Sequence, residues 1–302
     1  MIELAEERAA PPLSEVAVER VSRPRGWVRR LQERMSPRRV KTSAALRFYH
    51  EVLGLDHLHY GLWNGEPLSL AGLKGAQDRF ARHLCDWVPS ETRTILDVGC
   101  GTGSTAVLLA ARGFEVEGLS PDPSHERLFT RRVGTPFHLV RFQEFRPPRA
   151  YDLVLMSESA QYIWLDRFFP AVLEAAPGGR LLVADYFTVR ECAGPIARSG
   201  HRLEPFLDEA ERSGLVLERR EDVTDRVLPT LNLARSWLES YVEPCLRIAG
   251  EAVSAKRPRL AAVGRRLLRG RLAQLEELRQ LVDGAAFRAH KRYLMLLFRV
   301  PE

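Results

Sequence analysis

Paired cysteines are absent from this sequence. Its 302 residues include only four cysteines, and no two of them form a CxxC pair or stand beside histidine at the spacing of metal ligands. A zinc site and a disulfide framework are therefore not expected, and we predict no bound metal and a reducing compartment. The four are Cys85, Cys100, Cys192 and Cys245.

Long apolar runs are also missing. No stretch approaches the ~20 uninterrupted apolar residues that span a bilayer, and the first residues, MIELAEERAAPPLSE, are acidic and contain no apolar signal core. We therefore expect a cytoplasmic protein. With 45% hydrophobic and 28% charged residues, the chain has the composition of a globular enzyme and the length for one large α/β domain plus a helical cap.

The net charge of +6 is concentrated in two basic runs, at residues 20–41 and 256–271. Such runs suit nucleic acid, an anionic membrane surface or a phosphorylated substrate, although arginine-rich helix faces in solvent show the same pattern. No aromatic-interleaved RNA motif accompanies the charges, so we expect no nucleic acid partner. Peripheral membrane contact through the first run stays open.

In the middle of the chain, the spacing of apolar residues alternates between that of strands and that of helices. Strands are predicted at 94–98, 115–120, 137–142, 151–157, 180–187 and 215–224, and helices at 104–112, 124–132, 164–176 and 203–213. This alternation predicts an α/β fold with a doubly wound, Rossmann-like parallel sheet. Before it, residues 44–88 are predicted to form two or three helices. After it, helices at 229–250 and 258–283 precede a last strand at 292–300, which predicts a helical cap at the ligand-binding edge.

The segment Ile95-Leu96-Asp97-Val98-Gly99-Cys100-Gly101-Thr102-Gly103 joins the first strand to its helix. Glycines at alternate positions let a backbone approach a nucleoside closely, and their GxGxG spacing after an acidic strand end differs from the dinucleotide pattern GxGxxG. The segment resembles the S-adenosylmethionine (SAM) binding motif of class I methyltransferases. The resemblance implies that Asp97 anchors the SAM amino group, that the turn with Gly99, Cys100, Gly101 and Gly103 faces the methionine and ribose, and that S-adenosylhomocysteine is the product.

Two later positions of the same motif set are less regular. The second strand ends in Ser120, Pro121 and Asp122 where the family usually has an acidic residue, a departure similar to that of the cyclopropane fatty acid synthase branch. The resemblance implies that Ser120 or Asp122 binds the ribose. After the third strand, Phe142 and Gln143 stand where the family contacts adenine; ordinary core packing is the alternative for Phe142.

Glu158 directly follows the fourth strand, within Ser157-Glu158-Ser159-Ala160-Gln161-Tyr162. A carboxylate there is placed to act beside the sulfonium. The segment resembles the ES-x-x-Y stretch of isoprenoid diphosphate C-methyltransferases, which implies that Glu158 stabilises a cationic intermediate or removes its proton, with Tyr162 as a further catalytic candidate. The alternative for Glu158 is a structural one, a hydrogen bond to backbone amides.

Residues 49–63, YHEVLGLDHLHYGLW, precede the core. They resemble the aromatic, His-rich segment of tocopherol, sarcosine and phosphoethanolamine methyltransferases. The resemblance implies closure over SAM, with Tyr49 and Tyr60 near the sulfonium and His59 as a catalytic candidate; a structural hydrogen bond is the alternative for His59. Near the end of the chain, Phe287, His290 and Tyr293 are candidates for lining the acceptor pocket, with core packing favoured for Phe287.

These expectations divide the chain into a flexible arm (1–24), an N-terminal helical segment that closes over the cofactor (25–90), a SAM-binding Rossmann-like core (91–228), and a helical cap with the closing strand (229–302). We predict a SAM-dependent methyltransferase, of EC 2.1.1 type, acting on a lipophilic or natural-product small molecule. C-methylation with Glu158 as base or electrostatic stabiliser is favoured. N- or O-methylation and a non-catalytic SAM-binding scaffold are the alternatives, and the pattern names neither the acceptor nor the oligomeric state.

Overall fold

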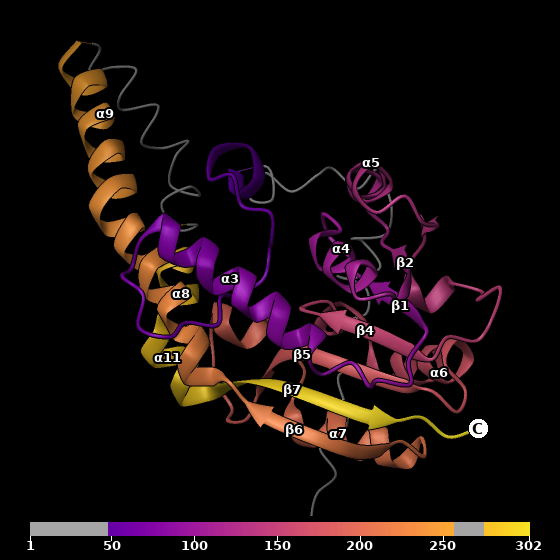
Figure 1. Ribbon diagram of the computed structural model, residues 1–302. Coiled ribbons are helices and arrows are strands. Elements are labelled where there is room, and N and C mark those ends of the chain that lie inside the picture. The colour runs from indigo at the N-terminus through magenta and orange to yellow at the C-terminus, as the bar shows by residue number, and fades with distance from the viewer. Residues whose placement is uncertain (1–47, 257–274) are drawn as a thin grey trace, which may run out of the picture. The chain divides into compact units, whose positions relative to one another are not determined.

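The computed structural model describes residues 48–256 and 275–302, which contain a seven-stranded sheet in the order β3-β2-β1-β4-β5-β7-β6 (Figure 1). The first five strands are parallel, and β7 runs antiparallel to both of its neighbours, β5 and β6. This confirms the predicted α/β, Rossmann-like fold, although β7 makes the sheet mixed where a parallel sheet was expected. The strands are β1 Thr94–Val98, β2 Glu115–Leu119, β3 Phe137–His138, β4 Leu153–Ser157, β5 Arg180–Thr188, β6 Val216–Asp222 and β7 Lys291–Arg299.

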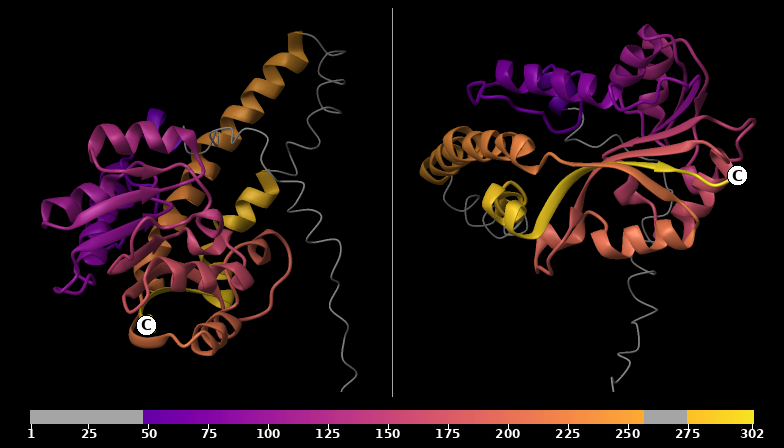
Figure 2. Two further views of the ribbon diagram at one scale, coloured as in Figure 1. Left: turned by 90° about the vertical axis from the view of Figure 1, so that its right-hand side faces the viewer. Right: turned by 60° about the horizontal axis from the view of Figure 1, so that its bottom comes forward.

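Helices cover both faces of the sheet (Figure 2). Side chains alternate along β1, so that Leu96 packs in one apolar cluster with Phe168 and Phe206, and Ile95 packs in the other with Phe80. Helices α6 (Leu165–Ala175) and α7 (Leu203–Arg212) supply the first cluster. Helices α3 (Leu70–Cys85), α4 (Ser104–Ala111) and α5 (Pro123–Arg132) supply the second. The two buried faces explain why the central strands are apolar throughout.

The predicted cap before the last strand is confirmed. Between β6 and β7 lie α8 (Thr224–Trp237), the π-helical turn η5 (Leu238–Val242), α9 (Glu243–Lys256) and α11 (Gly284–His290). Helix α11 packs on α8 so closely that a Cβ on Gly284 would lie 2.7 Å from Oδ1 of Asn232. One predicted helix, at 229–250, is in fact two helices and a π-turn. No helix in the two described ranges is long and apolar enough to cross a membrane.

The N-terminal part differs from the prediction. Residues 44–88 were expected to hold two or three helices, but the described residues hold the π-helical turn η1 (Phe48–Val52) and the single α-helix α3, which Ser69 caps. Residues 53–63, here called the strap, have no regular structure because their hydrogen-bonding partners lie elsewhere in the chain. The third strand is also shorter than predicted, since residues 142–144 form the 3₁₀ turn η2.

Several expectations concern residues outside the described ranges. These are the arm at 1–24, residues 25–47 of the predicted N-terminal segment, the basic run at 20–41 with its membrane contact, and most of the second basic run and of the helix at 258–283.

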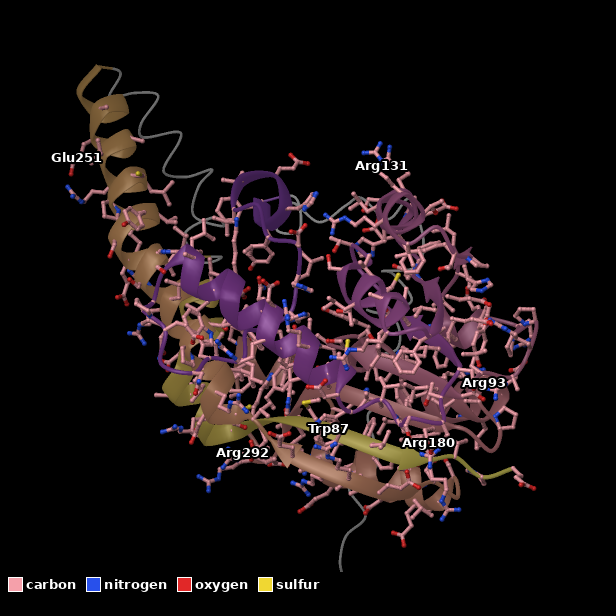
Figure 3. The ribbon with its side chains drawn as sticks, viewed as in Figure 1. Trp87, Arg93, Arg131, Arg180, Glu251 and Arg292 are labelled. Carbon is pink, nitrogen blue, oxygen red and sulfur yellow. The ribbon has the colours of Figure 1, made fainter. Side chains whose placement is uncertain are left out.

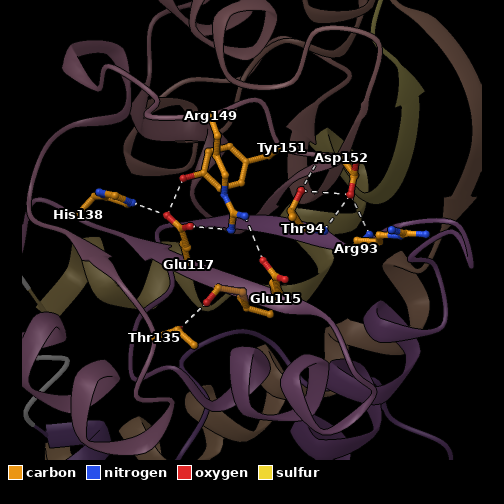
Figure 4. Close-up of polar contacts among 10 residues, drawn as sticks. Arg93, Thr94, Glu115, Glu117, Thr135, His138, Arg149, Tyr151 and Asp152 are labelled. Atoms are coloured by element: carbon orange, nitrogen blue, oxygen red, sulfur yellow. Dashed lines mark hydrogen bonds and ion pairs between the residues drawn. The ribbon is translucent and has the colours of Figure 1, made fainter.

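Polar contacts fasten the edges of the sheet. Buried Glu117 on β2 accepts hydrogen bonds from His138 Nε2 (2.7 Å), Arg149 Nη2 (2.7 Å) and Tyr151 Oη (2.6 Å), which joins β2 to β3 and to the approach to β4 (Figure 4). On another side, the Trp87 ring after α3 stacks under the Arg219 guanidinium of β6 at 3.8 Å from the ring centroid (Figure 3 labels Trp87). These contacts hold the two flanks around the central strands.

Candidate active site

Residues 99–103, here called the glycine turn, connect β1 to α4 at the carboxyl edge of the sheet. Gly99 has φ +79°, and a Cβ there would lie 2.4 Å from Cβ of Ser159. Only glycine therefore fits at this position, for conformation and for space. At Gly101 (φ +55°) the nearest side-chain atom to such a Cβ is Leu58 Cδ1, at 3.6 Å. The turn thus presents bare backbone beneath the strap.

Asp97 lies on β1 just before the glycine turn. Its side chain is 4% exposed, and its buried Oδ2 has no hydrogen-bond partner in the described part of the chain. Burial raises the pKa of Asp97 to about 7. An unpartnered buried carboxylate is costly to a fold and marks a place for a cationic ligand. The amino group expected for SAM fits this position, because it supplies both a positive charge and hydrogen-bond donors.

The strap crosses the glycine turn and is bonded to it. The carbonyl oxygen of Asp56 accepts hydrogen bonds from Thr102 Oγ1 (2.5 Å) and Ser104 Oγ (2.8 Å), and its carboxylate pairs with Arg132 Nη2 at 2.6 Å. At the other end of the strap, Thr230 of α8 accepts two hydrogen bonds. The strap is therefore tied to the turn at one end and to the cap at the other.

The predicted ribose ligands stand together at the end of β2 but already have partners. Ser120 Oγ bonds to His125 Nδ1 (3.0 Å) and accepts the N–H of Asp122 (3.2 Å). Asp122 Oδ1 accepts the N–H of Ser124 (2.8 Å) and caps α5. Both side chains are buried. Ribose binding by either residue stays a prediction.

The predicted adenine contacts follow β3, on η2. Phe142 is 3% exposed and belongs to the apolar cluster beneath α6. Gln143 is partly exposed. The packing alternative thus describes the surroundings of Phe142, while adenine contact stays a prediction for both residues.

Glu158 has an unusual backbone. It is the one non-glycine residue with positive φ (+54°) in the described part of the chain, a conformation that costs energy and concentrates at functional sites. Its Oε1 accepts hydrogen bonds from the N–H of Tyr60 (2.7 Å) and from Tyr293 Oη (2.9 Å). Burial, together with the charge of Asp185, raises the pKa of Glu158 to about 8 against these two hydrogen bonds.

Aromatic rings from the strap, the sheet and the cap gather around this carboxyl group. The Tyr60 ring lies 5.8 Å from Tyr293, 6.1 Å from Phe287 and 6.2 Å from Tyr186, measured between centroids. Burial and then the charge of Glu158 raise the pKa of Tyr49, which places Tyr49 in the field of the same carboxylate. The structure therefore brings together the predicted Glu158, Tyr49, Tyr60 and Tyr293.

His59 lies apart from this group, and Tyr162 lies at its exposed side. The His59 ring packs 4.6 Å from Phe80 and 4.8 Å from His57, its Nδ1 donates to the carbonyl oxygen of Tyr60 (2.8 Å), and burial lowers its pKa to about 3. It is therefore a neutral, packed histidine that orients the strap, and this position does not support the predicted catalytic role. Tyr162 is 77% exposed on η3 (Ala160–Tyr162) and has no hydrogen bond to Glu158, although burial and then the charge of that carboxylate raise the pKa of Tyr162 as they raise that of Tyr49.

Sequence reasoning missed Asp185 and Tyr186. They interrupt the apolar β5 near its carboxyl end, which is the same signal that singled out Asp97 and Glu158 on β1 and after β4. No group of three or more His, Cys, Asp or Glu side chains able to hold a metal ion occurs within residues 48–256 and 275–302.

Residues 72–214 match the family model described as "Methyltransferase domain". The chain is 27% identical over 218 residues to 27-O-demethylrifamycin SV methyltransferase of Amycolatopsis mediterranei, covering 64% of this chain and 78% of the relative. It is 26% identical over 225 residues to 2-methyl-6-phytyl-1,4-hydroquinone methyltransferase of Synechocystis, covering 65% and 69%.

Among solved structures, the fold is similar to geranyl diphosphate C-methyltransferase from Streptomyces coelicolor A3(2), crystallised with Mg²⁺, geranyl diphosphate and S-adenosyl-L-homocysteine. The TM-score is 0.60 at 17% identity, over 85% of this chain and 93% of that one. The sheet order, the glycine turn after Asp97 and these similarities all indicate a methyltransferase that binds SAM. The chain is a SAM-dependent methyltransferase with the class I, Rossmann-like fold, and SAM is its cofactor.

Proposed function

We propose that this enzyme methylates a carbon atom of a lipophilic small molecule, with Glu158 as general base or as electrostatic stabiliser of a developing positive charge. The observation that carries the proposal is the fixed position of the Glu158 carboxyl group. Tyr60 and Tyr293 both donate to Oε1, so neither bond uses Oε2. A carboxyl group with a pKa of about 8 is close to the optimum for proton transfer near neutral pH.

The lipophilic acceptor is inferred from the wall beside Glu158. Ile196, Leu228, Leu231 and Phe287 form a buried apolar cluster, and Tyr60 and Tyr186 pack against it. These side chains come from β5 and the loop after it, from α8, from α11 and from the strap. An acceptor bound there would exchange water for apolar and aromatic surface, which favours a hydrophobic molecule.

Residues of the core are proposed to hold the cofactor, and the strap and cap to cover it. Asp97 would pair with the amino group, and the backbone of the glycine turn would lie against the rest of the molecule. When bound, SAM supplies the methyl group on a sulfonium. The aromatic rings around Glu158 would attract this positive charge and exclude water from it.

O- or N-methylation is the second candidate. A base with a raised pKa equally removes the proton of a hydroxyl group or an ammonium group. The relative from Amycolatopsis is named for an O-demethylated acceptor, whereas the structural neighbour from Streptomyces is named a C-methyltransferase. The geometry at Glu158 is compatible with either reaction. C-methylation is favoured because the surrounding aromatic rings suit a cationic intermediate.

The test is Glu158→Gln, assayed with SAM and a panel of isoprenoid diphosphates, quinones, phenols and amines. We expect turnover of the accepted compound to fall at least ~100-fold with SAM affinity nearly unchanged, the size of a general-base contribution. Exposed Glu174 on α6 provides the matched control, Glu174→Gln, which should keep full activity. A parallel loss of SAM affinity would contradict the catalytic role. Tight SAM binding without turnover of any acceptor by the wild type would favour the scaffold alternative.

A further inference from the structure

Asp185 on β5 lies beneath the turn that carries Glu158, and it holds Gln161 of that turn. Asp185 is 1% exposed. Its Oδ2 accepts the backbone N–H of Gln161 at 3.2 Å, and its Oδ1 accepts the side-chain amide of Gln161 at 3.4 Å and the N–H of Tyr186 at 2.8 Å. Tyr186 Oη donates to Oε1 of Gln161 at 2.6 Å. Both the backbone and the side chain of Gln161 are thereby fixed to β5.

The two carboxylates lie on opposite faces of the sheet. Along β5, Ala184 and Tyr186 pack with the cluster that contains Tyr293, whereas Val183 and Phe187 pack with the cluster beneath α6 and α7. Asp185 alternates with Ala184 and so points to the second face, while the Glu158 carboxyl group meets Tyr293 on the first. Asp185 therefore contacts the turn through Gln161, and only its charge acts on Glu158 directly.

The turn needs such anchors because Glu158 is left-handed. A non-glycine residue at φ +54° persists only where its surroundings over-determine it. The N–H of Glu158 donates to the carbonyl oxygen of Ala184 (2.8 Å), and Ser159 Oγ donates to that of Val98 (2.5 Å). These contacts fix the start of the turn, and Asp185 fixes its end.

No side chain in the described ranges forms an ion pair with the buried Asp185 carboxylate. Lys291 is buried nearby, but its ammonium donates to the carbonyl oxygen (2.8 Å) and the hydroxyl (2.9 Å) of Ser199. A buried carboxylate that is held by amides and lacks a counterion costs stability, so a role at the neighbouring site is the better account of it.

We propose that Asp185 is a positioning residue: by holding Gln161, it keeps Glu158 left-handed and directs its carboxyl group to Tyr60 and Tyr293. The importance of this position for turnover rests on the role of Glu158 proposed above. The position itself is measurable without any acceptor, because a protonated carboxyl group gives an infrared C=O band whose frequency reports its hydrogen bonds.

The test is infrared titration of the whole protein between pH 5 and about 9.5, with the Glu158 band identified by its absence in Glu158→Gln. In Asp185→Ala, loss of the clamp should move the band to the higher frequency of a carboxyl group without hydrogen bonds. An unchanged band in folded Asp185→Ala would overturn the proposal.

Asp185→Asn is the milder variant and serves if the alanine variant does not fold. It offers one acceptor oxygen in place of two and removes the negative charge. We expect the same band shift in smaller form. Loss of the negative charge lowers the Glu158 midpoint while weaker hydrogen bonds raise it, so the band position is the readout for this variant. A wild-type band in Asp185→Asn would contradict the proposal. The titratable groups that interact with Glu158 are Tyr49 of η1, Tyr60 of the strap, Tyr162 of η3, Asp185 and Tyr186 of β5, and Tyr293 of β7. Lys291 of β7 acts on Asp185.

Asp152 supplies a matched control at the other end of β4. Its Oδ2 also accepts two backbone N–H groups, from Arg93 (2.8 Å) and Thr94 (2.9 Å) (Figure 4). Asp152 precedes β4, whereas Glu158 follows it. Asp152→Asn should lower stability yet leave the Glu158 band and midpoint unchanged, and a shift in this variant would show that the readout follows stability alone. If the band moves in Asp185→Ala while Glu158→Gln keeps full turnover, the proposed function fails and the positioning relationship stands.

Discussion

The backbone N–H of Tyr60 donates a 2.7 Å hydrogen bond to Oε1 of Glu158, across 98 positions of the sequence. The strap therefore ends its passage over the glycine turn on the same carboxyl group that we propose for catalysis. Because the donor is a backbone group, no substitution at residue 60 other than proline removes it. The position of the strap and the orientation of the Glu158 carboxyl group therefore depend on each other.

Tyr293 provides the second donor to Glu158, and its removal changes the pH dependence of turnover. The hydrogen bond from Tyr293 favours the charged carboxylate and so lowers the pKa of Glu158. In Tyr293→Phe this pKa should rise, and the acidic limb of the kcat profile should move to higher pH by about half a unit or more. Tyr241→Phe, at an exposed position, is the control. A limb that stays in place would separate Tyr293 from catalysis.

Asp97 makes cofactor binding depend on pH. Its pKa is about 7 in the free protein, and pairing with the cofactor amino group requires the charged form. Below about pH 7 the affinity for S-adenosylhomocysteine should therefore fall, approaching tenfold per pH unit. Calorimetry from pH 5.5 to about 8.5 measures this slope. Asp97→Asn should bind weakly with a flatter slope, because only the ligand's own groups then titrate, and tight binding by Asp97→Ala would refute the assignment.

Three buried carboxyl groups predict how the stability of the free protein changes with pH. Burial raises the pKa of Asp97 and Asp185 to about 7 and that of Glu158 to about 8. A raised folded-state pKa contributes stability that is present at acidic pH and lost as the pH rises through the folded value. The melting temperature should therefore fall between pH 5.5 and about 8.5. Asp97→Asn should flatten this curve, and a melting temperature that rises over the range would contradict the prediction.

Thr230 holds the strap to the cap with one hydroxyl group. Its Oγ1 accepts the N–H of Gly61 (3.0 Å) and the indole N–H of Trp63 (2.9 Å). Thr230→Val keeps the shape of the side chain but leaves both donors without a partner, at a cost of about 2 kcal/mol or more. Urea unfolding measures the loss. Thr230→Ser retains the hydroxyl and should lose less than half as much, so equal losses would place the effect in packing instead.

The fold and the cofactor turn were predictable because their signals are local. Period-two apolar patterns set the strands, and the sequence from Asp97 to Gly103 contains its own turn chemistry. The strap was mispredicted as helical because its donors and acceptors pair with Gln77, Thr102, Glu158 and Thr230, none of which is visible in the strap itself. The surroundings of His59 were hidden for the same reason, since the Phe80 ring that it packs on belongs to α3; its hydrogen bond to the Tyr60 carbonyl agrees with the structural alternative, and a catalytic role stays a prediction.

The surroundings of Glu158 also divide into features with a local sequence signal and features that depend on distant residues. Its place after a strand was evident, and Tyr293 was a candidate for the pocket. That Tyr293 would face Glu158 depends on the antiparallel insertion of β7 beside β5, where Tyr186 and Tyr293 are in register. The role of Asp185 depends on a turn whose left-handed residue is a glutamate, which no composition rule predicts.

The insertion of β7 between β5 and β6 also constrains how the molecule is made. Residues 216–222 of β6 have no strand to pair with until residues 291–299 have been synthesised, because β7 separates β6 from the rest of the sheet. The parallel strands β1 to β5, with the glycine turn, can assemble during synthesis, whereas β6 and the aromatic wall must wait. Long-range pairing of this kind is slow, and it leaves an unpaired edge that is prone to aggregation. A nascent chain halted before β7 would thus display a cofactor fold without a finished acceptor site.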